Sequence, residues 1–115
     1  MADMKHNHWR RLIVESLQAG TVNIPYSLLK FYKQLKLNEA EVMLLIHLLS
    51  FRQLEGKTFP TVYELQERMT VAGNDVVEHL RQLVGKQFIE IVEETDENGL
   101  RSTRYDLQPL FERLA

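Results

Sequence analysis

The sequence predicts a mainly α-helical domain that carries one small β-hairpin. Capping boxes, in which Glu follows a helix-capping residue by three positions, mark two helix starts at Asn38–Glu41 and Thr61–Glu64. An Asn98–Gly99 turn lies between two runs of apolar and polar residues, which is the strongest short signal for a hairpin. In this order the elements predict a winged helix-turn-helix over residues 38–107, preceded by a helix–strand–helix arm over residues 1–37.

Length and composition indicate one ordinary globular domain. A chain of 115 residues with 44% hydrophobic and 26% charged residues can bury a core without metal or disulfide bonds. The absence of cysteine excludes a disulfide framework and a thiolate nucleophile, and it fits a reducing cytoplasm. The longest apolar run, Val42–Ile46, is too short to cross a bilayer, and the N-terminus does not read as a signal peptide. We therefore expect a cytoplasmic protein.

Charge is unevenly distributed along the chain. Residues 1–37 carry a net charge of +4, whereas the remaining residues carry −6. This asymmetry suggests attraction between copies or two different partners, although two solvated surfaces that differ in charge explain it equally well.

The arm is expected to contain two helices and a short strand. Asn7 can cap a first helix, which Gly20 would end. The stretch Thr21–Ile24 alternates like a strand, and Pro25 can then open a second helix through about Leu35.

The predicted helix from Asn38 to about Gln53 is apolar on two sides. One arc comprises Ala40, Leu44, Leu48 and Phe51, and the other comprises Val42, Leu45, Ile46 and Leu49. A helix with two apolar sides must be covered on both. We expect the core to cover one side and the arm, from the same chain or a neighbour, to cover the other.

The remaining elements complete the expected winged helix. Lys57–Pro60 is a plausible first strand, and the turn Thr70–Gly73 leads into a third helix. The inward residues of that helix are Val76, Val77, Leu80, Leu83 and Val84. Strands over residues 88–92 and 100–107 form the hairpin, and residues 108–115 form a C-terminal helix.

The surfaces that would read DNA carry the wrong charge. The third helix presents a mixed set of outward side chains: Asn74, Asp75, Glu78, His79, Arg81, Gln82 and Lys86. Its first turn is acidic, which suits the helix dipole but repels phosphates. In a two-residue hairpin turn, Asp96 would lie opposite Arg101 and Glu93 opposite Arg104. The basic residues of the wing would then pair across the strands and would not be available to bind DNA. Protein contact is therefore favoured over base reading.

Other candidate sites are weak. Lys30, Lys33 and Lys36 form a basic edge, which we expect to be solvated but which could contact DNA phosphates or an acidic wing of another copy. His6 and His8 make a poor metal site, and nothing resembles a phosphate loop or a catalytic group of residues. We expect no enzyme activity, no metal and no cofactor.

The order of these landmarks resembles the N-terminal domain family of DnaD, from a primosomal replication-initiation protein of low-GC Gram-positive bacteria. The resemblance spans about residues 12–114 and rests on a set of motifs in order: Ile24–Pro25, Leu28–Leu29, Tyr32, Leu37–Asn38–Glu39, Glu41, Leu44–Leu45, Pro60, Leu65, Met69, Asn98–Gly99, Tyr105, Leu107 and Pro109–Leu110. It implies a role in loading the replicative helicase, with the initiator DnaA, with PriA and with helicase-loading proteins. It also implies self-association through the arm, and DNA affinity located mainly in a C-terminal domain that this chain lacks.

We therefore expect an oligomerising, protein-binding winged helix. The arm should pair two copies as a dimer, with Val22 and Ile24 as strands beside Trp9, Leu28, Phe31 and Tyr32, and a second contact would build a tetramer. The alternative is a transcription regulator that reads duplex DNA with residues 74–86. A small-molecule-sensing domain is a third option.

Overall fold

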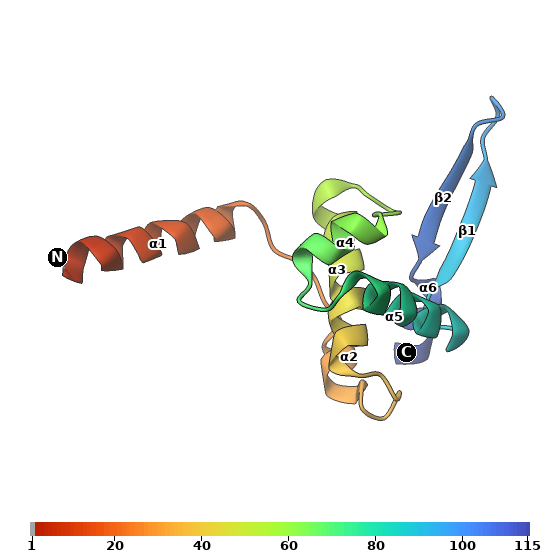
Figure 1. The fold of residues 1–115 in the computed structure, drawn as a ribbon, viewed down its shortest axis with the longest axis horizontal. Helices are drawn as coiled ribbons and strands as arrows, with labels where there is room; N and C mark the ends of the chain where they lie inside the picture. The colour runs from red at the N-terminus through yellow and green to blue at the C-terminus, as the bar shows by residue number, and fades with distance from the viewer. Residues whose placement is uncertain (1) are drawn as a thin grey trace.

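The structure is a computed structural model that describes the backbone of residues 2–115 and side chains from Asn7 onward. Figure 1 shows a helical body from which one helix and a two-stranded hairpin project in different directions. The elements in order are α1 (Ala2–Gln18), α2 (Tyr26–Phe31), α3 (Glu39–Glu55), α4 (Val62–Arg68), α5 (Gly73–Gly85), β1 (Glu90–Thr95), β2 (Arg101–Asp106) and α6 (Gln108–Leu114). The predicted mainly helical class with one antiparallel hairpin is confirmed.

Helix α3 lies at the centre of the body and begins where its capping box predicts. The Glu41 amide donates to Asn38 Oδ1 at 2.8 Å, and the Asn38 amide donates to Glu41 Oε1 at 3.0 Å. The box at the start of α4 is also formed, because the Glu64 amide donates to the Thr61 hydroxyl at 3.1 Å. Both pairs satisfy amides that a helix start would otherwise leave without partners.

The prediction that α3 is covered on two sides is confirmed. Leu44 and Leu48 on one side, and Leu45 and Leu49 on the other, are all buried. The arm supplies the second cover, since its residues that pack against the core are Val22, Ile24, Leu28, Tyr32 and Leu35. All of them come from the same chain as the α3 that they cover.

The arm differs from prediction at both of its helices. Helix α1 starts at Ala2, so Asn7 lies inside the helix and is not its cap. Residues 2–6 continue the helical backbone ahead of Asn7, which removes the free helix start that a cap needs. Helix α2 ends at Phe31, earlier than Leu35, because the chain turns there and reaches a left-handed backbone at Lys36 with φ of 63°.

Two predicted strands do not form within the chain. Thr21–Ile24 and Lys57–Pro60 belong to no sheet, and the only sheet in the described residues pairs β1 with β2. For the second stretch, the Tyr105 amide donates to the Thr58 carbonyl at 2.9 Å, which is one ladder contact and not a strand. A strand needs an edge along which to pair, and neither stretch finds a continuous one in a single copy.

The hairpin pairs one residue out of the predicted register. Arg104 lies opposite Val92, and Arg101 lies opposite Thr95. The cause is a three-residue loop, because the Asp96 amide donates to the Leu100 carbonyl and Gly99 takes a left-handed φ of 80°. Arg104 pairs with Glu94 at 3.0 Å instead of with Glu93.

The apolar stripe of α5 is only partly buried. Val76, Leu80 and Leu83 face the core, whereas Val77 and Val84 are exposed beside the hairpin. The buried stripe is therefore narrower than the sequence predicts, because Val77 and Val84 line an open hollow between α5 and the hairpin.

Candidate self-association surface

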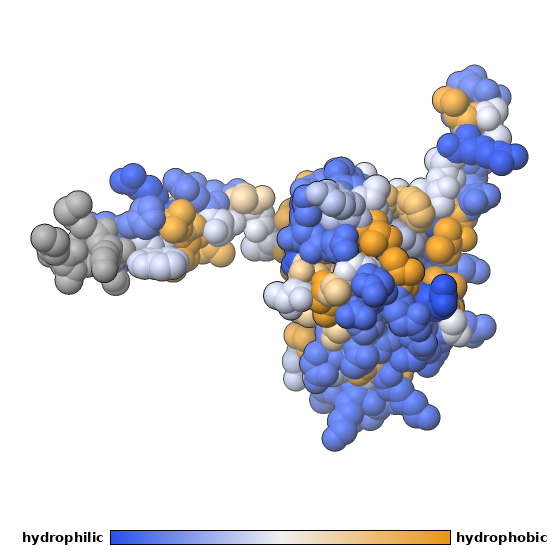
Figure 2. Space-filling view, viewed as in Figure 1, coloured by the Kyte–Doolittle hydropathy of each residue, from blue (hydrophilic) through white to orange (hydrophobic). Residues whose placement is uncertain are grey.

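Helix α1 projects from the body (Figure 1), and its large apolar side chains are exposed. Trp9 is 64% exposed, and Leu12, Ile13 and Leu17 are exposed as well. At 100° per residue these four side chains share one side of the helix. Orange apolar surface is visible along this helix in the space-filling view (Figure 2). An exposed apolar stripe of this kind marks a candidate interaction surface.

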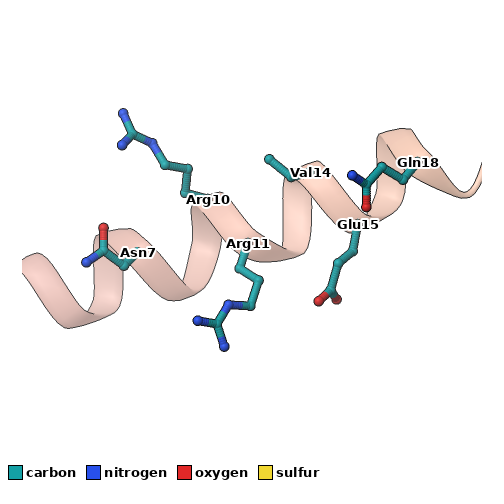
Figure 3. A pocket seen from close by; sticks show the side chains of 6 residues that line it. All are labelled: Asn7, Arg10, Arg11, Val14, Glu15 and Gln18. Carbon is teal, nitrogen blue, oxygen red and sulfur yellow. The ribbon is translucent and has the colours of Figure 1, made fainter.

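The opposite side of α1 is polar. A shallow hollow on it is lined by side chains of this helix alone: Asn7, Arg10, Arg11, Val14, Glu15 and Gln18 (Figure 3). No other element contributes to the hollow, so it offers no enclosed binding site. Arg10 and Arg11 lie on this polar side of the helix.

The stretch Thr21–Ile24 presents one free backbone edge. The Asn23 amide donates to Gln53 Oε1 at 2.7 Å, and Gln53 Nε2 donates to the Asn23 carbonyl at 2.9 Å. The side-chain amide of Gln53 thus makes the pair of bonds that a neighbouring strand would make. In extended backbone the next residues face the other way, and no hydrogen bond to the backbone of Val22 or Ile24 is formed within residues 2–115.

The other predicted contact residues of the arm differ in how far they are buried. Leu28 is fully buried and Tyr32 is half-buried, so these two residues hold the arm to the body. Phe31 is exposed, with Lys30 Nζ 5.5 Å from its ring centre. Lys30, Lys33 and Lys36 are all exposed, as expected for a basic edge.

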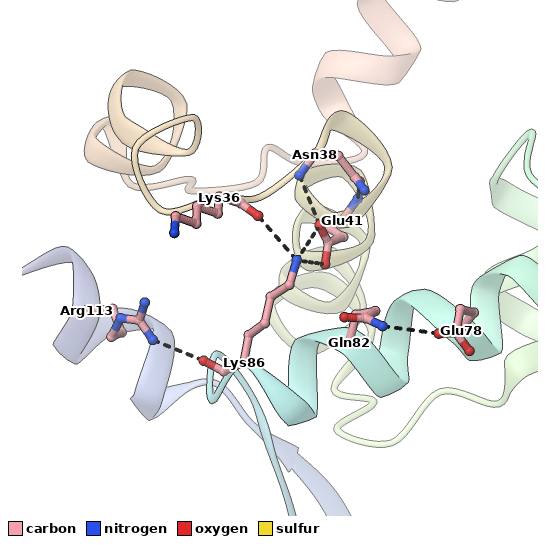
Figure 4. Close-up of polar contacts among 7 residues, drawn as sticks. All are labelled: Lys36, Asn38, Glu41, Glu78, Gln82, Lys86 and Arg113. Atoms are coloured by element: carbon pink, nitrogen blue, oxygen red, sulfur yellow. Dashed lines mark hydrogen bonds and ion pairs between the residues drawn. The ribbon is translucent and has the colours of Figure 1, made fainter.

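Lys86 is a structural residue and not the free contact that the sequence predicts. Its Nζ lies 3.0 Å from Glu41 Oε2 and 3.1 Å from Glu41 Oε1, and it donates to the Lys36 carbonyl at 3.2 Å (Figure 4). Glu41 is only 1% exposed, so this ion pair offsets the cost of burying its carboxylate. The Lys86 carbonyl also accepts from Arg113 at 3.0 Å, which attaches α6 to the end of α5.

The other polar residues of α5 remain at the surface and contact one another. Gln82 donates to Glu78 at 3.2 Å, and Arg81 lies 3.8 Å from the same carboxylate, while Asn74 is exposed. Glu78 therefore engages Gln82 and Arg81, two of the three side chains on α5 that could read base edges.

Hollows that form between elements escape prediction from the sequence, and two of them lie on α5 and α3. One lies between α5 and the hairpin, has a volume of about 460 Å³ and is lined by Val77, Leu80, Arg81, Val84, Gly85, Ile91 and Tyr105. The second, which we name the α3 hollow, has a volume of about 320 Å³ and is lined by Glu39, Ala40, Met43, His47, Arg68, Met69, Thr70 and Val71. Both form where separate elements pack against one another, and the periodicity of apolar residues within one element does not predict which elements will be neighbours.

Ionisation in the α3 hollow is set by burial. The pKa of His47 is lowered by its partial burial and, to a lesser extent, by the nearby Arg68 guanidinium. Arg68 itself is held by Glu55 at 2.8 Å and lies 3.9 Å from the centre of the Phe51 ring. The hollow therefore presents a neutral imidazole at neutral pH.

The described residues hold no cluster of three or more metal-ligating side chains, and the His6–His8 pair, which the sequence indicates is a poor metal site, lies partly outside them, at the His6 side chain. No helix among these residues has the length and apolar character needed to span a membrane.

Comparison with known proteins identifies the family. The sequence profile of the DnaD N-terminal domain matches residues 24–115, most of the chain. The chain belongs to this family. It is 37% identical over 105 residues to the replicative helicase loading/DNA remodeling protein DnaD of Bacillus subtilis (strain 168), covering 91% of this chain. It spans 45% of the length of that relative.

A solved structure in the same family has the same architecture. The crystal structure of the N-terminal domain of DnaD from Geobacillus kaustophilus HTA426 matches with a TM-score of 0.72 and 40% identity, over 90% of this chain and 84% of that one. The resemblance to DnaD drawn from the sequence motifs is confirmed. The mainly helical fold with one hairpin is accordingly that of the DnaD N-terminal domain.

Proposed function

We propose that this chain is the self-associating, protein-binding domain of a primosome protein that supports loading of the replicative helicase. Its family membership supports a replication role over the alternative of a transcription regulator reading DNA with residues 74–86. The observation that carries self-association is the unpaired backbone edge of Val22 and Ile24, next to an uncovered apolar helix.

The geometry of Asn23 specifies how two copies would pair. The Gln53 side chain bonds to both the amide and the carbonyl of Asn23. The backbone amides and carbonyls that remain free to pair with another copy are therefore those of Val22 and Ile24. Antiparallel pairing about a two-fold axis then places Val22 of one copy opposite Ile24 of the other. This forms the strand that the sequence predicts and that a single copy lacks. A further contact elsewhere would join dimers into a tetramer.

The architecture and charge support protein partners over DNA. We propose that α3, α4, α5 and the hairpin form a winged helix, whose third helix carries Asp75 and Glu78 at the surface. Glu90, Glu93, Glu94, Asp96 and Glu97 make the hairpin acidic. Phosphates would be repelled by both elements. By family resemblance the partners are DnaA, PriA and the helicase-loading proteins, with DNA bound weakly.

Paired Asp substitutions test the strand contact. Val22→Asp with Ile24→Asp should convert the dimer to a monomer in sedimentation equilibrium, because two carboxylates would face their counterparts across the two-fold axis. Leu100→Asp is the matched control, since Leu100 is an exposed apolar residue at the far hairpin tip. Circular dichroism checks that each variant remains folded, and a folded double variant that stays dimeric would rule out this contact.

A further inference from the structure

The tip of the hairpin carries a chemically labile pair of residues. Asn98–Gly99 is the only Asn–Gly pair in the sequence. Asparagine is a thermolabile residue, and a following glycine has no Cβ to hinder attack by its backbone nitrogen on the asparagine side chain. Both residues are exposed, and no heavy atom lies within 4 Å of the position that a Cβ of Gly99 would take. We propose that Asn98 is a site of spontaneous deamidation and that Asp96 controls its rate.

The reaction needs only these two residues and water. The Gly99 backbone nitrogen loses its proton and bonds to Cγ of Asn98. The bond from Cγ to the side-chain nitrogen breaks, and ammonia leaves with that proton, so that a cyclic imide remains. Water then adds to one of the imide carbonyls and opens the ring to aspartate or isoaspartate. One amide and one water thus become one carboxylate and one ammonium ion, and no oxidant, metal or cofactor takes part.

The folded turn opposes this reaction, because the attacking nitrogen is already engaged. The Gly99 amide donates to the Asp96 carbonyl at 3.0 Å. Oδ1 of Asp96 accepts from the Asn98 amide at 2.9 Å and from the Leu100 amide at 2.8 Å. The Asp96 amide donates to the Leu100 carbonyl at 2.9 Å. All of these bonds involve Asp96, which therefore holds Gly99 away from the Asn98 side chain.

The loop itself lies in solvent. The hairpin projects from the body, and its tip lies away from the helices (Figure 1). Glu97 and Leu100, which flank the Asn–Gly pair, are exposed. Water therefore reaches the turn, and local opening of the turn limits the reaction, without unfolding of the whole domain.

Deamidation changes the charge and the shape of the hairpin tip. Either product adds one negative charge to a chain whose formal net charge is −2. Isoaspartate also carries the backbone through the former side-chain carbon, which lengthens the loop and separates the Asp96 amide from the Leu100 carbonyl. The proposal concerns covalent chemistry at the turn and does not depend on the proposed function.

Mass spectrometry of the tryptic peptide 87–101 measures the reaction directly, because Asn98 is its only asparagine. At mildly alkaline pH we expect the parent chain to deamidate several-fold more slowly when folded than when unfolded in urea. Asp96→Ala should deamidate several-fold faster than the parent when both are folded. In urea, where the turn is absent, the two chains should deamidate at the same rate.

Two further variants serve as controls. Glu93→Ala removes a carboxylate from the same hairpin and leaves the hydrogen bonds of the turn in place, so it should deamidate at the rate of the parent. Asn98→Gln should leave the mass of the peptide unchanged over the same period, which identifies the reacting residue. Circular dichroism checks that each variant is folded.

Each other outcome contradicts a defined part of the proposal. An unmodified peptide from the parent in urea would overturn Asn98 as the site. Equal rates in the folded parent and folded Asp96→Ala would overturn the role of Asp96, as would the same acceleration of Asp96→Ala in urea. An equal acceleration in Glu93→Ala would show that the charge of the hairpin sets the rate, and not the hydrogen bonds of the turn.

Discussion

At the scale of single residues, Lys86 holds together three parts of the molecule. Its ammonium group binds the buried Glu41 carboxylate and the Lys36 carbonyl at the end of the arm, and its own carbonyl accepts from Arg113 of α6. The left-handed backbone of Lys36 orients that carbonyl toward the body. A lysine on an outward-facing stretch of sequence can thus be a structural residue, which periodicity alone cannot reveal.

Removal of the Lys86 charge should destabilise the fold. Lys86→Met leaves Glu41 buried without its cation, and breaking a buried pair costs about 3–5 kcal/mol. Because the Lys86 side chain is 34% exposed, we expect the loss to be nearer 2–3 kcal/mol. Urea denaturation at a fixed protein concentration measures it. Lys33→Met, on the exposed basic edge, is the control, and an equal effect of the two substitutions would contradict a structural role for Lys86.

His47 should make stability depend on pH. Burial lowers the pKa of His47 in the folded state below its ordinary value of 6.5, so the unfolded chain binds its proton more readily. The resulting stability is present above about pH 6.5 and is lost as pH falls toward the folded-state pKa. The free energy of unfolding should therefore decline less between pH 7 and pH 5 in His47→Gln than in the parent. Parallel pH profiles would refute this assignment.

At the scale of elements, local signals predict helix starts and turns but not pairing details. The capping boxes of α3 and α4 are satisfied within three residues, so the sequence specifies them completely. The hairpin location follows from Asn98–Gly99, yet its register depends on whether two or three residues close the loop. An Asn–Gly pair fits both loop lengths, and the hydrogen bond from the Asp96 amide to the Leu100 carbonyl identifies the three-residue loop.

Two glycines provide opposite tests of this account. Gly99 has a φ of 80° and no heavy atom within 4 Å of an added Cβ, so Gly99→Ala should cost about 1–2 kcal/mol through backbone strain alone. Gly85 has equally open space but lies in α5, so Gly85→Ala should stabilise by up to about 1 kcal/mol. Thermal denaturation of the two variants measures both effects. Equal shifts in the same direction would show that the loop does not impose the left-handed backbone.

At the scale of the whole molecule, the arm has a predicted strand and a helix that a single chain leaves without partners within the described residues. The sequence predicts a strand at Thr21–Ile24 and an amphipathic helix before it, but one copy provides neither a strand edge nor an apolar cover. The two-sided burial of α3 was predictable because its apolar arcs lie in one helix. The hollows on α3 and beside the hairpin were not, because each is built from side chains of separate elements.

Self-association is the central claim, and molar mass across concentration tests it most directly. Multi-angle light scattering should show the 13.5 kDa chain rising to at least twice that mass as concentration increases, and Val22→Asp with Ile24→Asp should keep it at the monomer mass. A parent chain that stays at 13.5 kDa at every concentration would contradict the account.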